Sequence, residues 1–135
     1  MAGRRVLVVE DEPFIALSIE EMIGDIGGAC VGVASTVREA LAALVSLSPN
    51  FVVLDISLGD ERSHQVADQL AERAIPFVFI SGYGAAGIPA QHKSHACVAK
   101  PLGEWDFAEA IAAELKTDLA KPVAAEPNAS KPTAS

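Results

Sequence analysis

Four short apolar runs in this sequence end in side chains that can do chemistry. Glu10 and Asp11 follow the first run, Asp55 the second, Ser81 the third and Lys100 the fourth. Three carboxylates brought close together repel one another, so some must take up a proton or hold a cation. Oxygen ligands without His or Cys favour a hard ion such as Mg²⁺. A carboxylate, a divalent cation, a lysine and a hydroxyl together match what the phosphorylation of an aspartate requires.

These side chains meet only if the runs that precede them are strands of one sheet. The runs are residues 6–9, 51–54, 77–80 and 96–99, and none of them alternates with polar residues. That pattern is typical of strands buried on both faces of a parallel sheet. Residues 29–34 are a weaker fifth candidate. In a parallel sheet all the carboxyl ends lie at one edge, where open α/β folds bind their ligands.

Helical periodicity fills most intervals between the runs. Apolar residues at helical spacing predict helices over 15–26, 37–45, 66–74 and 108–119. The interval 82–89 differs, because its three Gly and one Pro predict a loop, or a fourth helix that is short or mobile. Strands alternating with helices predict a doubly wound, five-stranded parallel sheet of the α/β class.

Composition and charge narrow the possible partners. Lys and Arg number 10 and Asp and Glu 18, a formal net charge of −8. This charge repels nucleic-acid phosphates and anionic lipid, so we expect no nucleic acid and no membrane as partner. No apolar run approaches the roughly 20 residues of a membrane-spanning helix. We expect a soluble, cytoplasmic domain over residues 1–120 and a disordered Ala-, Pro- and Ser-rich tail over 121–135.

The ends of the four runs resemble the receiver domains of two-component response regulators. The resemblance covers residues 5 to about 119 and lies in Val8-Val9-Glu10-Asp11-Glu12, Leu54-Asp55, Ile80-Ser81-Gly82 and Ala99-Lys100-Pro101. It implies a flavodoxin-like receiver fold with Asp55 as phosphoacceptor and a cis Lys100–Pro101 bond. It further implies phosphoryl contacts from Ser81 and Lys100. The implied ligands of Mg²⁺ are Glu10, Asp11, Asp55 and the backbone carbonyl of Ser57.

A narrower resemblance lies in residues 76–83, Pro-Phe-Val-Phe-Ile-Ser-Gly-Tyr. The stretch is similar to the PFxFATGY (FATGUY) motif of a subgroup of single-domain response regulators, with Ile80 and Ser81 in place of Ala and Thr. This subgroup is similar to partners of unorthodox histidine kinases in alphaproteobacteria, and its fourth helix tends to be loose. Most receivers carry an aromatic switch residue where this chain has Cys97. Tyr83 is therefore the candidate to replace it.

The interpretation we favour is a stand-alone response regulator in a phosphorelay. A histidine kinase would phosphorylate Asp55, and the chain would signal by protein–protein interaction, catalysing only its own phosphorylation and dephosphorylation. A phosphate sink and a phosphorylation-independent binding module are the alternatives. A phosphohydrolase is less favoured, because Ser57, two residues after Asp55, is not the acid that would protonate a leaving group.

Two interpretations of nearby residues stay open at this level. Either Glu10 or Glu12 could point outward, and Glu12 could simply favour the positive end of the following helix. His92, His95 and Cys97 suggest a second metal site, but these residues lack a convincing fourth ligand.

Overall fold

The computed structural model of the chain describes residues 1–82, 87–88 and 90–120, without the side chains of 117–120. The predicted tail and Tyr83 lie outside these residues. Between the last two strands, the described residues include a short 3-10 helix, η2 (Ala90–His92). The prediction of a short or mobile fourth helix falls largely on residues 83–86 and 89, which are likewise outside the described part.

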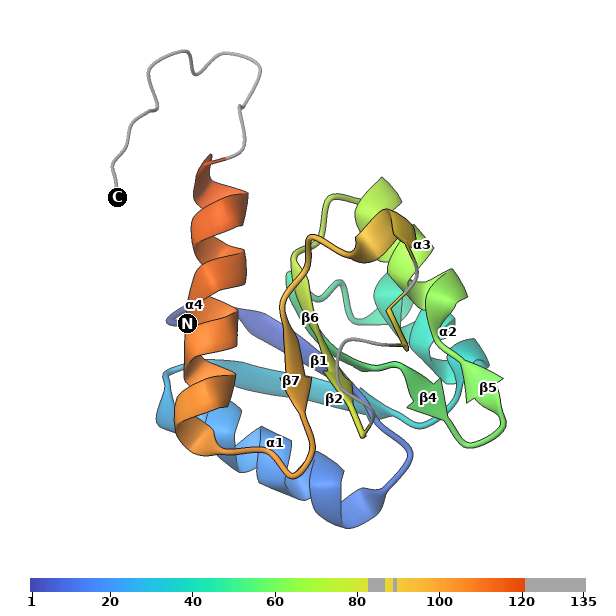
Figure 1. The fold of residues 1–135 in the computed structure, drawn as a ribbon, viewed down its shortest axis with the longest axis horizontal. Helices are drawn as coiled ribbons and strands as arrows, with labels where there is room; N and C mark the ends of the chain where they lie inside the picture. Colours follow the sequence, from blue (N-terminus) through green and yellow to red (C-terminus); the bar gives the residue numbers. More distant parts are fainter. Residues whose placement is uncertain (83–86, 89, 121–135) are drawn as a thin grey trace.

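Five strands of the described chain form one parallel sheet (Figure 1). In chain order they are β1 (Arg5–Val9), β2 (Ala29–Ala34), β3 (Phe51–Asp55), β6 (Phe77–Ser81) and β7 (Cys97–Ala99). Across the sheet the order is β2-β1-β3-β6-β7. The chain adds β2 on one side of β1 and then adds β3, β6 and β7 on the other side, so the strand order reverses between β1 and β3. Val9 pairs with Leu54, and Asp55 pairs with Ile80. The predicted doubly wound parallel sheet is confirmed, with the weaker fifth run as the edge strand β2.

Helices cover both faces of this sheet (Figure 1). Their bounds are α1 (Pro13–Asp25), α2 (Val37–Ser46), α3 (His64–Glu72) and α4 (Glu104–Ala120). Apolar side chains of α1 and α4 pack on one face, and those of α2 and α3 pack on the other. All five residues of β3 and of β6 are therefore buried, which explains why these runs show no polar alternation. No described helix is both long enough and apolar enough to cross a lipid bilayer.

The helices differ from prediction at their ends. α3 and α4 begin at His64 and Glu104, earlier than the apolar stripes that start at 66 and 108. The first turn of α4 carries Glu104 and Asp106. Carboxylates at this position favour a helix start electrostatically without contributing to an apolar stripe.

A short hairpin that was not predicted follows β3. β4 (Ser57–Leu58) pairs antiparallel with β5 (Glu61–Arg62). Gly59 lies in the connecting turn with a φ of 61°, in the left-handed region that glycine adopts without strain. Strands of two residues are too short to show a period, so the local sequence predicts only a loop here.

Candidate functional site

Three carboxylates converge at the carboxyl edge of the sheet. Glu10 and Asp11 follow β1, and Asp55 is the last residue of β3. Oxygens of the three carboxylates lie within 4.8 Å of one another. Glu10 and Asp55 are only 1% and 2% exposed, whereas Asp11 faces solvent. Three negative charges at this spacing need a proton or a cation, and a donor set made of oxygens alone fits Mg²⁺.

Lys100 contacts the two buried acids of this pocket. It follows the edge strand β7, and its Nζ lies 2.9 Å from Asp55 Oδ2 and 3.0 Å from Glu10 Oε1. The Lys100–Pro101 peptide bond is cis, as the family resemblance implied. One ammonium balances only one of three carboxylates when all are ionised. The pocket therefore keeps an excess of negative charge that a divalent cation would offset.

Burial and ion pairing shift the pKa values of two groups in the pocket. Burial raises the pKa of Glu10 to about 7, and the charge of Asp55 adds to the rise, although the Glu12 N–H and Lys100 favour the charged form. Partial burial opposes the charge of Lys100, but hydrogen bonds to Asp55 and Glu10 outweigh it and raise the pKa of Lys100 above its usual value. Near neutral pH, Lys100 is charged while Glu10 is partly protonated.

Two backbone N–H groups hold the buried carboxylates in position. Glu12 N donates to Glu10 Oε2 at 3.1 Å, and Ser57 N donates to Asp55 Oδ1 at 3.2 Å. Of the two candidate glutamates, Glu10 points inward, while Glu12 is exposed at the N-cap of α1. Ser57 itself belongs to β4, so the unpredicted hairpin begins at the pocket.

Ser81 lies at the same edge of the sheet. It is buried at the end of β6, next to Ile80, which pairs with Asp55. The Ser81 carbonyl accepts the Lys100 N–H at 2.9 Å, which ties the end of β6 to the lysine. The strand ends singled out in the sequence therefore all meet at one edge.

Comparison with known proteins decides the family. Residues 6–112 match the response regulator receiver domain. The chain belongs to the response regulator receiver family. This receiver domain is 34% identical over 101 residues to the phyllosphere-induced regulator PhyR of Methylorubrum extorquens. It is 33% identical over 111 residues to the positive alginate biosynthesis regulatory protein of Pseudomonas aeruginosa. These matches cover 72% and 78% of the receiver domain chain but 38% and 45% of the relatives, so it spans less than half of their length.

Solved structures share the receiver fold. SdrG from Sphingomonas melonis Fr1 matches with a TM-score of 0.73 at 35% identity, over 83% of this chain and 96% of SdrG. PhyR from Brucella abortus matches with a TM-score of 0.81 at 32% identity, over 94% of this chain and 53% of PhyR. The predicted receiver fold is confirmed. The narrower resemblance to the PFxFATGY subgroup stays a prediction.

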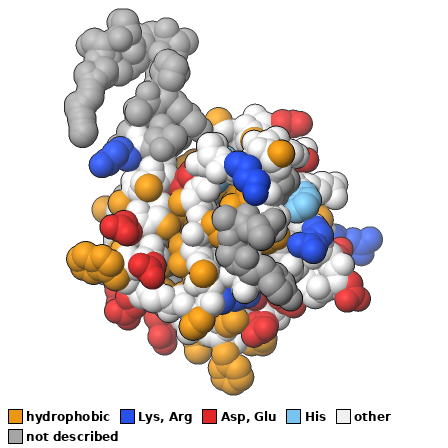
Figure 2. Space-filling model, viewed as in Figure 1, with side chains coloured by type: hydrophobic (Ala, Val, Ile, Leu, Met, Phe, Trp, Pro, Cys, Tyr) orange, Lys and Arg blue, Asp and Glu red, His pale blue; other side chains and the backbone are white. Residues whose placement is uncertain are grey.

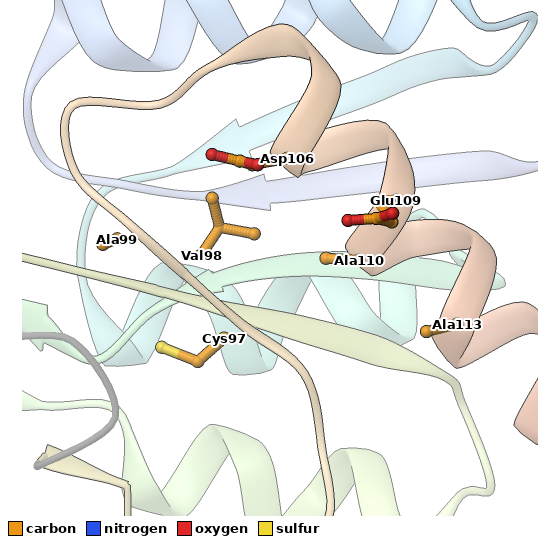
Figure 3. Close-up of a pocket in the computed structure, with 7 residues that line it drawn as sticks. All are labelled: Cys97, Val98, Ala99, Asp106, Glu109, Ala110 and Ala113. Carbon is orange, nitrogen blue, oxygen red and sulfur yellow. The ribbon is translucent and has the colours of Figure 1, made fainter.

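Of the two candidate switch residues of the receiver domain, the structure describes Cys97 but not Tyr83. Tyr83 lies outside the described residues. Cys97 is half-buried in β7, and burial raises the pKa of its thiol. It is one wall residue of a groove of about 370 Å³ between β7 and α4. In Figure 3 the Cys97 side chain points away from α4 and Val98 points toward it, consistent with their packing on opposite faces of the sheet. The switch role of Tyr83 or Cys97 stays a prediction.

Two histidines of the receiver domain, His92 and His95, each contact a carboxylate. His92 Nε2 lies 2.8 Å from Asp68 Oδ1, and His95 Nδ1 lies 3.0 Å from Glu114 Oε1. The His95 ring stacks on Phe77 with 4.1 Å between centroids. Within the described part of the chain, the acidic pocket is the only group of three or more donors close enough to share an ion. The second metal site weighed above therefore finds no support.

Exposed apolar side chains lie beside the pocket, and two of them, Phe14 and Leu17, were missed in the sequence. Phe14, at the start of α1, is 85% exposed and is followed by the exposed Leu17, while Trp105 near the start of α4 is 81% exposed. Figure 2 shows hydrophobic side chains protruding at the lower side of the molecule, over α1. A signal was available, because Phe14 and Leu17 lie off the helical stripe of Ile19 and Ile23 that is buried.

Proposed function

We propose that this response regulator accepts a phosphoryl group from a histidine kinase on Asp55 and passes the signal on through protein–protein contacts. The observation that carries the proposal is the buried Asp55 carboxylate, which contacts Lys100 and shares a pocket with Glu10 and Asp11. Burying several charges is a poor way to stabilise a fold, so this cluster is better explained by its chemistry. In this proposal the chain catalyses only its own phosphorylation and dephosphorylation.

The donor set of the pocket supports Mg²⁺ as the cofactor. Glu10, Asp11 and Asp55 would hold the ion, together with the backbone carbonyl of Ser57. Bound there, Mg²⁺ would spread the negative charge that develops on the phosphoryl oxygens. The excess of carboxylates over lysine in the pocket supports a divalent ion.

Asp55 is the nucleophile in the proposed reaction. One of its carboxylate oxygens forms a bond to phosphorus, and the P–N bond of the phosphohistidine breaks with its electron pair staying on the imidazole nitrogen. The Ser57 N–H on Oδ1 and the Lys100 ammonium on Oδ2 orient the carboxylate for this step. Lys100 balances charge on the phosphoryl oxygens, and the Ser81 hydroxyl donates a hydrogen bond to them.

The exposed side chains beside the pocket support a kinase as the phosphoryl donor. Phe14 and Leu17 on α1 and Trp105 on α4 offer apolar contact area next to the sheet edge where Asp55 lies. Exposed apolar groups around a polar site are typical of a protein interface. We propose a kinase of the unorthodox alphaproteobacterial type and transfer in the cytoplasm. The net charge of −8 disfavours nucleic acid and membrane surfaces as partners.

The proposal is tested by the mass of the intact protein. Incubation with acetyl phosphate and Mg²⁺ is expected to add one phosphoryl group to the wild type and none to Asp55→Asn, which keeps the shape of the side chain without the nucleophilic charge. Asp60→Asn is the matched control, because Asp60 is exposed in the neighbouring hairpin turn. A wild type that gains no mass, or an Asp55→Asn variant that gains as much, would refute the proposal.

Further assays separate the alternatives. A phosphate sink lowers the phosphorylation of a second receiver when both compete for one kinase, whereas a signalling regulator gains a binding partner on phosphorylation. A phosphorylation-independent module binds its partner equally well as wild type and as Asp55→Asn. A phosphohydrolase would turn over a phosphomonoester at about 1 per second or faster.

A further inference from the structure

The hairpin after Asp55 reaches across to the start of α2. Glu61, on the hairpin strand β5, accepts the Val37 N–H with its Oε1 at 3.1 Å. Val37 is the first residue of α2, and an N–H at that position has no acceptor within its own helix. The two residues are far apart in sequence, so Glu61 is a helix cap supplied from another element.

The same hairpin borders the acidic pocket at two points. On β4, the Ser57 N–H donates to Asp55 Oδ1 at 3.2 Å. At the turn, a Cβ added to Gly59 would lie 3.8 Å from Asp11 Oδ2. Any shift of the hairpin would therefore move backbone next to both Asp55 and Asp11.

The two strands of the hairpin are anchored very differently. β4 is held by the core, because its Leu58 and the preceding Ile56 are both buried. β5 is exposed, and a ribbon with two residues in each strand is not stable by itself. The start of α2 is a firm anchor for it, since Thr36 Oγ1 accepts the Glu39 N–H at 3.0 Å. The Glu61–Val37 bond joins the exposed strand to this anchor.

We infer that Glu61 is a positioning residue for the pocket. By fixing β5 on α2, its carboxylate holds the hairpin, and with it the Ser57 backbone, against the acidic cluster. The inference rests on the proposed function, because it assigns Glu61 an effect on Mg²⁺ binding and on phosphorylation at Asp55. Glu61 touches neither the three carboxylates nor Lys100 in the described contacts, so it acts through the hairpin.

Three variants separate this role from a simple charge effect. Glu61→Ala removes both the acceptor and a charge, Glu61→Gln keeps an acceptor oxygen, and Asp60→Ala removes a neighbouring charge in the exposed turn. Two readouts are measured on each full-length variant. The first is hydrogen exchange of the Val37 amide in metal-free protein, and the second is the Mg²⁺ dissociation constant from an amide-spectrum titration.

The positioning role predicts a specific pattern. In Glu61→Ala the Val37 amide exchanges faster and Mg²⁺ binds about three- to tenfold more weakly, the size expected for losing one hydrogen bond. Glu61→Gln and Asp60→Ala stay within about twofold of the wild type, because an exposed charge alone contributes little. A third readout, the rate of phosphorylation by acetyl phosphate at saturating Mg²⁺, is expected to recover in Glu61→Ala, since only ion binding is impaired.

Other outcomes would overturn the inference. Faster Val37 exchange with unchanged Mg²⁺ affinity means that the bond exists but does not position the pocket. Equal weakening in Asp60→Ala and Glu61→Ala means that charge alone is responsible. Failure of the proposed function looks different, because then the wild type itself neither binds Mg²⁺ nor accepts a phosphoryl group.

Discussion

The ammonium of Lys100 lies 2.9 Å from Asp55 Oδ2, which joins the end of the edge strand β7 to the end of the central strand β3. β6 lies between these two strands, so the lysine spans the sheet edge over the end of that strand. The same Nζ lies 3.0 Å from Oε1 of Glu10, the residue that directly follows β1. One side chain therefore organises the acids supplied by two strands, and its removal is the clearest perturbation of the pocket.

Lys100→Met is predicted to slow phosphorylation by acetyl phosphate by about 100-fold, because the positive charge that offsets the phosphoryl oxygens is gone while the stem still fills its space. The rate is followed by intact mass at saturating Mg²⁺. Lys116→Met, at an exposed position on α4, is the control and should react at the wild-type rate. A Lys100→Met rate within twofold of the wild type would exclude the lysine from the reaction.

Stability without Mg²⁺ is predicted to fall as the pH rises from about 4.5 to about 7 because of Glu10. The folded chain keeps this proton to a higher pH than the unfolded chain, so it binds more protons in this window. Relative to Glu10→Gln, which does not titrate, the wild type should lose on the order of 3 kcal/mol between pH 4.5 and 8. Denaturant unfolding of both proteins at the two pH values measures this difference, and parallel profiles would contradict it.

Phe14→Asp is predicted to weaken phosphotransfer from the kinase without affecting acetyl phosphate. Phe14 is 85% exposed, so the change leaves the core intact and removes apolar contact area beside Asp55. An interface anchor of this kind contributes about 2 kcal/mol or more, so KM for the kinase should rise about 30-fold or more. Val45→Asp, at an exposed apolar position of α2 on the other face of the sheet, is the control. Equal effects of the two variants would show that Phe14 is not part of the surface that the kinase contacts.

Glu114→Ala is predicted to destabilise the fold by about 2–3 kcal/mol, because it leaves buried hydrogen-bond donors without an acceptor. Glu114 accepts the Ala96 N–H at 2.8 Å and pairs with His95 at 3.0 Å, just before β7 begins. Glu109→Ala, exposed on the same helix, should cost less than about 0.5 kcal/mol. Urea unfolding at pH 7 measures both, and equal losses would show that Glu114 does no more than a surface residue.

Much of the fold and the pocket could be predicted from the sequence because the strands are buried on both faces. Continuous apolar runs such as 51–54 and 77–80 mark their own ends, and the next residue in each case, Asp55 and Ser81, lies at the carboxyl edge. Parallel pairing then brings these residues together without further information. The choice of Glu10 over Glu12 needed coordinates, because both flank the same turn.

Contacts between distant segments left no local signal. The bond from Glu61 to Val37 and the pairs that His92 and His95 make with acids on α3 and α4 join residues far apart in the chain. Each of these side chains is an ordinary surface type in its own window of sequence. The β4–β5 hairpin was missed for a related reason, since its strands are shorter than one period of any pattern.

The residue that carries the phosphoryl group can be identified directly, and we expect it to be Asp55. Borohydride reduces an acyl phosphate to an alcohol, so treating the protein after incubation with acetyl phosphate and Mg²⁺ marks the modified carboxylate for peptide mass mapping. Reduction is expected at Asp55 alone, and only when Mg²⁺ is present. Reduction at Asp11 or at another carboxylate, or no reduction at all, would contradict it.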